Sequence, residues 1–181
     1  MRFKVEHRVS AVDALALYRA FRDQSLEYLK SMPAIHSAEM LDASPAARRI
    51  HWRAKGDVPA AVKAFVKPSD LHWVEETRWD DGSLEARTVV TRPGSDVLHC
   101  QSVLRFRPQG DGVHVECEGD LKIKLPLVGS MVEYAAARAI KENMGLFLEE
   151  FARSTVQPPA SDVGAPPAAA AALAGPTAST G

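Results

Sequence analysis

Apolar and charged residues alternate from the start of the chain. One side of this period-two pattern is apolar except for a histidine, and it consists of Phe3, Val5, His7 and Val9. The pattern predicts a half-buried strand. Ser10 then has a side chain suited to a helix N-cap, and apolar positions at helical spacing follow it. We expect two short helices here, the second beginning at Asp23 and ending at Pro33.

Strand patterns fill most of the stretch between residues 35 and 125. The pairs Asp81-Gly82 and Asp111-Gly112 mark tight turns between neighbouring strands. In the last strand, 113–125, one parity is apolar and the other charged, and only Gly119 interrupts the apolar row. A glycine at such a position is typical of a bend in the strand. About six such strands joined by short turns predict an antiparallel meander.

A long helix is expected from about Leu127, directly after Pro126. Its apolar stripe recurs every three or four residues and includes Val132, Ala136, Ile140, Met144, Phe147 and Phe151. Such a helix is amphipathic and large enough to cover one face of the sheet. Gly145 lies inside it, where glycine is locally unfavourable. Small side chains at Ala135, Ala136 and Ala139 predict that any internal space lies nearer the start of this helix.

Composition divides the 181-residue chain into one domain, residues 1–155, and an Ala/Pro-rich segment, residues 156–181. The second segment has almost no large apolar side chain to offset its ordering entropy, so we expect a disordered tail. The net charge of −1 argues against nucleic acid as a partner. No apolar run is long enough to span a bilayer, which leaves room only for transient membrane contact. Two cysteines without a secretory signal indicate reduced thiols in a cytoplasmic protein.

Three segments carry a resemblance to a known family: the opening residues 3–7, the stretch 73–80, and the strand–Pro126-Leu127-Val128-Gly129–helix junction. Together they resemble DUF2505, a bacterial family of unknown function within the START-like (SRPBCC; Bet v 1 and polyketide cyclase) superfamily. The resemblance covers roughly residues 1 to 153. It implies an α+β helix-grip fold, in which a curved antiparallel sheet of about seven strands wraps around the long C-terminal helix. It also implies a cavity that holds a lipid, a quinone, a polyketide or a similar molecule.

The residues expected to line that cavity are mainly inward positions of the strands and of the long helix. They are His7, Trp52, Trp73, Glu75, Trp79, Thr88, Cys100, Cys117, Val132, Ala136 and Ile140. The tryptophans could form a wall for a flat ligand or pack as ordinary core. His7 and Glu75 interrupt apolar rows, so they are either polar handles in the cavity, an acid–base pair, or groups that reach solvent or a backbone partner at a local irregularity. The two cysteines could be near neighbours, and we expect them to be buried, reduced thiols.

These features predict a binder or carrier of a small hydrophobic molecule, such as a lipid, an isoprenoid quinone or a polyketide-like compound. No nucleophile, phosphate-loop or dinucleotide motif is present in the sequence, and no cofactor or metal is expected. An enzyme of the cyclase or dehydratase type, using Glu75 and His7, is the second interpretation. A ligand-free scaffold that acts through a protein partner is the third. We expect a monomer or a weak dimer.

Overall fold

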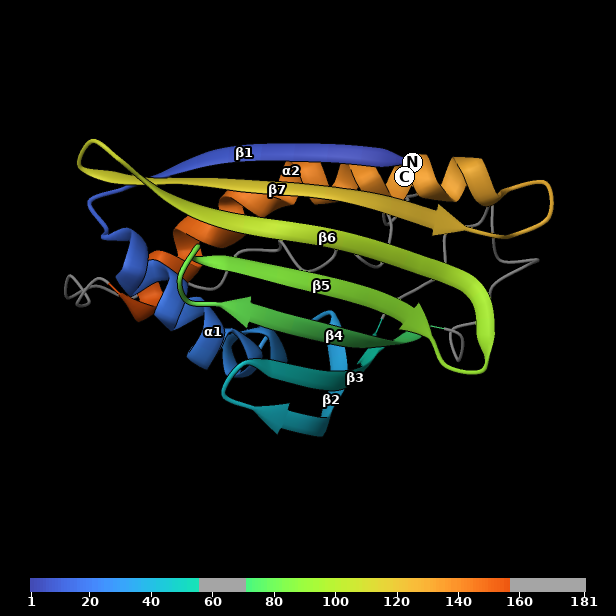
Figure 1. Cartoon of the computed structure of the whole chain (residues 1–181). Coiled ribbons are helices and arrows are strands. Elements are labelled where there is room, and N and C mark those ends of the chain that lie inside the picture. The colour runs from blue at the N-terminus through green and yellow to red at the C-terminus, as the bar shows by residue number, and fades with distance from the viewer. Residues whose placement is uncertain (56–70, 157–181) are drawn as a thin grey trace.

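One antiparallel sheet and two helices form the part of the chain that the computed structural model describes, residues 1–55 and 71–156 (Figure 1). The sheet order is β1-β7-β6-β5-β4-β3-β2, with seven strands in the described residues. The elements in chain order are β1 Arg2–Ser10, α1 Ala14–Lys30, β2 Ile35–Ser44, β3 Ala47–Ala54, β4 His72–Asp80, β5 Glu85–Arg92, β6 Ser95–Gln109, β7 Gly112–Ile123 and α2 Gly129–Thr155. This confirms the predicted helix-grip arrangement. Apart from Val156, the expected tail lies outside the described residues.

The first helix differs from the prediction in two details. α1 is one continuous helix rather than two short ones, because its buried positions, including Leu17, Tyr18 and Leu26, keep helical spacing straight past Asp23. The Asp23 carboxylate binds the neighbouring Arg22 side chain instead of capping a new helix. Ser10 is the last residue of β1, and the N-cap is Asp13, whose side chain accepts a hydrogen bond of 2.9 Å from the Ala16 amide.

Helix α2 runs along β1 and β7 in the direction of β1, as Figure 1 shows. Its first turns lie beside the N-terminus, where Glu133 accepts a hydrogen bond of 2.8 Å from the Ile123 amide. Farther along, the His7 ring occupies the space that a side chain at Gly145 would need, since a Cβ there would lie 2.7 Å from His7 Nδ1. The glycine that the sequence marks as unfavourable therefore lets the helix approach β1 closely.

Aromatic side chains fill the end of the molecule where α1 meets the second half of α2. Tyr18 and Phe21 of α1 pack edge-on against Trp79 of β4, with ring centroids 6.0 Å apart in each pair. Phe21 and Tyr28 make similar contacts with Phe151 of α2. This cluster extends the largest core of buried residues, which also takes in the inward rows of β1, β6 and β7. The predicted parity of β1 and β7 is confirmed.

Gly119 serves a close approach rather than a sharp bend. The Phe3 ring of β1 lies over it, and a Cβ at this position would be 2.4 Å from Phe3 Cζ. Strand β7 continues without interruption through Gly119 to Ile123. The gap in the apolar row therefore makes room for a large neighbour on the adjacent strand.

Neither α1 nor α2, the helices of the described residues, has an apolar stretch of the length that crossing a bilayer requires.

Candidate functional site

A polar row crosses the inner face of the sheet, perpendicular to the strands. The strand registers place Arg48 of β3 opposite Thr77 of β4, Thr77 opposite Thr88 of β5, and Thr88 opposite Ser102 of β6. Ser102 in turn lies opposite Gly119 of β7. Four neighbouring strands thus contribute a charged or hydroxyl side chain at the same height. The same inner face is apolar toward Trp79 on one side of this row, and apolar apart from Glu75 on the other.

Glu75 stands next to the polar row, one inward position along β4. Thr77 Oγ1 donates a hydrogen bond of 3.2 Å to its Oε1, and the Thr77 and Thr88 hydroxyls lie 3.1 Å apart. Burial raises the pKa of the Glu75 carboxyl, while the Arg48 charge, the Thr77 hydroxyl and the Trp52 indole oppose that rise. The residue as a whole is only half-buried although its carboxyl lies deep in the protein. Its surroundings therefore favour the protonated form more than water does.

Arg48 is a buried cation at the edge of this group, with 9% of its surface exposed. Its Nη2 donates to Ser25 Oγ at 2.9 Å and its Nη1 to the Arg22 carbonyl at 3.2 Å, so it ties β3 to α1. The guanidinium also lies over the Trp79 ring, 5.1 Å from its centroid. Burial lowers the pKa of Arg48, and the Glu75 charge raises it. A buried arginine normally pairs with a carboxylate, yet none of the ion pairs within 4.0 Å in residues 1–55 and 71–156 involves Arg48.

The tryptophans separate into two locations. Trp52 of β3 is opposite Trp73 of β4 at one end of the inner face, and Trp79 belongs to the aromatic cluster at the other end. Trp52 is 2% exposed, while Trp73 is half-buried. The Trp52 Nε1–H is close enough to lower the pKa of Glu75 but has no hydrogen bond of normal geometry. Trp52 and Trp73 can therefore border one site, whereas Trp79 packs with α1.

The inner face is tightly packed at one end and reachable at the other. Toward α1, its residues are buried, as at Ala86, Leu104 and Phe106. Toward the start of α2, Ile50, Trp52 and Leu121 are buried as well, but other inward positions stay half-buried. These half-buried positions are Trp73, Glu75, Thr88, Val90, Cys100 and Ser102. Val132, Ala136 and Ile140 of α2 are half-buried as well. This is the end at which the alanines of the helix predict internal space.

His7 does not meet Glu75. Its Nε2 lies 3.1 Å from Glu149 Oε1 of α2, and three strands separate β1 from β4. The cysteines do not face one another either, because Cys100 is opposite Leu121 and Cys117 is opposite Leu104. Burial raises the pKa of Cys100 to about 11 and that of Cys117 to about 12. Both thiols therefore stay protonated and behave as small apolar side chains.

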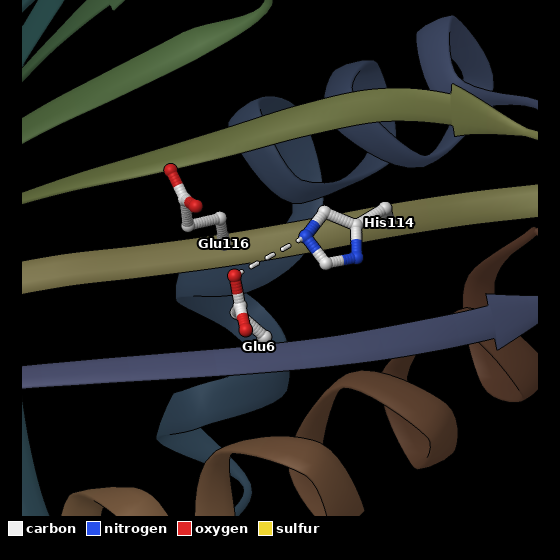
Figure 2. Close-up of side chains that lie close together, drawn as sticks. All are labelled: Glu6, His114 and Glu116. Carbon is white, nitrogen blue, oxygen red and sulfur yellow. Dashed lines mark ion pairs between the residues drawn. The ribbon is translucent and has the colours of Figure 1, made fainter.

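On the outer face, Glu6 of β1 and His114 and Glu116 of β7 come close together (Figure 2). Their ligand atoms lie within 4.8 Å of one another, a spacing that a metal ion could accept. Both carboxylates already bind cations, however: Lys4 Nζ lies 2.8 Å from Glu6 and 2.9 Å from Glu116. Arg105 Nη1 lies 2.8 Å from Glu116. This group is accounted for as part of a surface ion-pair network.

A hollow of about 820 Å³ follows strands β1, β7, β6 and β5. Many of its lining side chains belong to the charged, outward rows, such as Lys4, Arg87 and Glu118, but it also takes in Thr88, Ser102 and Gly119 of the polar row. An open, charged hollow suits a small apolar ligand less well than an enclosed space with few polar groups. The inner-face part of the polar row, which this hollow borders, is therefore the stronger candidate site.

Sequence reasoning did not include Arg48, Thr77 and Ser102 among the site residues. Arg48 shares the inward parity of Ile50 and Trp52, and this parity is the signal in the sequence that could have identified it. Thr77 and Ser102 can be assigned to the site only from the strand register, which places both of them opposite Thr88.

Residues 1–150 match the family described as "Protein of unknown function (DUF2505)". No curated protein matches the chain. Among solved structures, TTHA0849 from Thermus thermophilus is similar with a TM-score of 0.63 and 22% identity, over 83% of this chain and 96% of that one. The Zhui aromatase/cyclase from Streptomyces sp. R1128 gives 0.60 and 15%, over 84% and 95%. A START superfamily protein from Mycobacterium smegmatis gives 0.53 and 18%, over 82% and 93%.

Proposed function

The chain belongs to the DUF2505 family, and we propose that it binds a small apolar molecule between the inner face of its sheet and the first half of α2, without transforming it. Its fold is that of START-like and Bet v 1-like proteins and of polyketide aromatase/cyclases, and this fold supports the binding of hydrophobic ligands. The proposed ligand is lipid-like, quinone-like or polyketide-like. The proposed setting is the cytoplasm, with the protein as a monomer or weak dimer.

One observation carries the proposal: a polar row on an inner face that is half-buried on one side of that row. A sheet packed only for stability would close this face with large apolar side chains, as the opposite end of the same sheet does around Phe106. Instead Thr88, Ser102 and Glu75 remain half-buried. A mainly apolar recess with a few placed polar groups is the usual form of a small-molecule site.

The raised pKa of Glu75 favours a second candidate function, an enzyme of the cyclase or dehydratase type with Glu75 as a general acid. The acid–base pair expected from the sequence does not form, because His7 of β1 binds Glu149 of α2, three strands away from Glu75. Any such enzyme would therefore use Glu75 with Thr77, Thr88 or Arg48. A ligand-free scaffold is the third alternative, and the experiment below separates it from the other two.

The test compares two tryptophan substitutions on adjacent residues of α2. Ala136 is half-buried and faces the proposed recess, whereas Ala135 is exposed. The probe is N-phenyl-1-naphthylamine, an uncharged dye whose fluorescence rises when it is enclosed. We expect Ala136→Trp to abolish dye binding and Ala135→Trp to preserve it, with unchanged far-ultraviolet circular dichroism in both.

Native mass spectrometry of the purified full chain completes the test. A co-purifying mass that is present in Ala135→Trp and absent in Ala136→Trp supports binding at this recess. No dye binding by the unmodified chain, or equal binding by both variants, contradicts it and favours a scaffold. If the bound molecule changes mass during incubation with the protein, but not with Glu75→Gln, the enzyme is favoured over the carrier.

A further inference from the structure

Two buried donors without an acceptor flank Glu75. In residues 1–55 and 71–156, the buried side-chain nitrogen and oxygen atoms that lack a hydrogen-bond partner are Arg48 Nε and Trp52 Nε1. Both belong to the inner row of β3, on either side of Ile50, and Ile50 is the residue opposite Glu75. Arg48 and Trp52 are therefore the two diagonal neighbours of the same carboxyl group. Buried N–H groups without an acceptor are rare in folded proteins, so finding both beside one residue calls for an explanation.

The protein itself offers these donors the Glu75 carboxyl, but neither donor forms a hydrogen bond of normal geometry with it. Glu75 accepts a hydrogen bond from the Thr77 hydroxyl, and the Trp52 indole lies close enough to lower the pKa of Glu75. Among the described residues, Glu75 forms no ion pair within 4.0 Å with Arg48. The cross-strand neighbours of Glu75 on β3 and β5, Ile50 and Val90, are apolar. Both donors therefore lack a well-placed acceptor in an otherwise apolar environment.

We propose that the Arg48, Trp52 and Glu75 group receives a carbonyl oxygen of the ligand, so that the ligand is an apolar, uncharged molecule with a ketone or quinone oxygen at one end. This inference rests on the proposed function above and names the ligand class. A carbonyl oxygen accepts up to two hydrogen bonds and brings no charge, which fits a site where Arg48 and an ionised Glu75 already balance one another. A carboxylate would instead meet the Glu75 carboxyl as a like charge and would require Glu75 to bind a proton.

The apolar body of the ligand would extend from this group toward α2. Trp73, Val90 and Cys100 are half-buried on that side of the inner face, and Ala136 and Ile140 of α2 are half-buried as well. Trp73 offers a flat, partly reachable ring opposite Trp52. A ring system that carries the carbonyl fits this combination of an aromatic wall and a donor group.

The experiment uses three naphthalenes that differ in a single substituent. 2-Acetylnaphthalene has a ketone, 2-ethylnaphthalene replaces the carbonyl by a methylene, and 2-naphthoate has a carboxylate. Each displaces N-phenyl-1-naphthylamine from the full-length chain, and the concentration for half displacement is measured. We expect the ketone to bind about tenfold more tightly than the hydrocarbon, the effect of roughly one net hydrogen bond to buried donors.

Two variants test whether this preference comes from the named donors. Trp52→Phe removes the indole N–H, and Arg48→Lys removes the Nε–H while keeping the positive charge, so both should reduce the ketone-to-hydrocarbon ratio toward one. Trp73→Phe is the matched control: it changes both affinities together and keeps the ratio. Circular dichroism establishes that each variant is folded. If Trp52→Phe is not folded, the result from Arg48→Lys decides.

Equal binding of ketone and hydrocarbon by the unmodified chain would overturn this inference while leaving the proposed ligand binding intact. Tighter binding of 2-naphthoate than of the ketone would also overturn it, because the site would then select an anion. Failure of the dye itself to bind would overturn the proposed function first.

Discussion

Replacing Gly145 with alanine tests how closely α2 approaches β1. In an unobstructed helix interior this change stabilises a protein by roughly 0.8–1.0 kcal/mol, because alanine has the higher helix propensity. Here the new Cβ would lie 2.7 Å from His7 Nδ1, 3.0 Å from Cε1 and 3.3 Å from Cγ. Since even Cγ is close, the ring must move as a whole and cannot escape by a small rotation.

The magnitude follows from what His7 loses. Its 3.1 Å hydrogen bond to Glu149 contributes about 0.5–1.5 kcal/mol, at the low end because Glu149 is exposed. A side chain forced off its rotamer costs about 0.5–1.5 kcal/mol more. Together these losses are about 1–3 kcal/mol, so after the gain in helix propensity Gly145→Ala should destabilise the protein by up to about 2 kcal/mol.

The assay is a double-mutant cycle with His7→Ala, in which the free energy of unfolding is measured from urea titrations followed by circular dichroism. In the His7→Ala background the obstruction is gone, so Gly145→Ala should stabilise the protein by roughly 0.8–1.0 kcal/mol. The sign of the effect therefore reverses between the two backgrounds. If alanine at position 145 is equally destabilising in both, the His7 ring is not the reason for the glycine and the reasoning is refuted.

Three further predictions concern buried groups. Glu75→Gln should raise the free energy of unfolding by about 1 kcal/mol at pH 8 and lose this advantage near pH 4. The reason is that a carboxyl whose pKa is raised in the folded state makes the protein less stable as the pH rises through the unfolded and then the folded pKa. Equal pH profiles of the two proteins would contradict this. Gly119→Ala should destabilise the protein by about 1–3 kcal/mol in urea titrations, and by less in a Phe3→Leu background, since its Cβ would clash with the Phe3 ring. Cys117, which is buried, should react with Ellman's reagent at pH 8 only as fast as the protein unfolds, and rapid labelling of this thiol in the native protein would contradict its burial and raised pKa.

Elements with a strong internal period were predictable from the sequence. The apolar parity of β7 and of β1 reappears as buried residues such as Val113, Val115 and Val9, because a one-residue slip would expose the whole row. The long helix was predictable in the same way, from the apolar stripe that recurs every three or four residues. The division of α1 into two helices was wrong, since Asp23 has the chemistry of a cap but sits on a helix whose buried face continues past it.

The candidate site was only partly predictable, because it depends on relations between strands. Glu75 and Thr88 stand out along their own strands as polar residues on an inward parity. The row that joins Arg48 to Ser102 exists only through three successive registers, and no single segment contains it. The placement of His7 beside Gly145 was equally invisible, since it depends on how α2 lies across β1.

Stability alone does not explain the Arg48, Trp52 and Glu75 group. Two of the three hydrogen-bonding nitrogens of Arg48 hold α1 against the sheet, so part of the desolvation of this cation is offset by the bonds to Ser25 and Arg22. That role would be complete without a buried carboxyl on β4 and without an indole N–H turned toward it. An apolar side chain at position 75 would fill the row beside Ile50 and Val90 without burying a carboxyl. The group therefore makes physical sense when a further acceptor joins it, and the half-buried surface beneath the first half of α2 is where such an acceptor can enter.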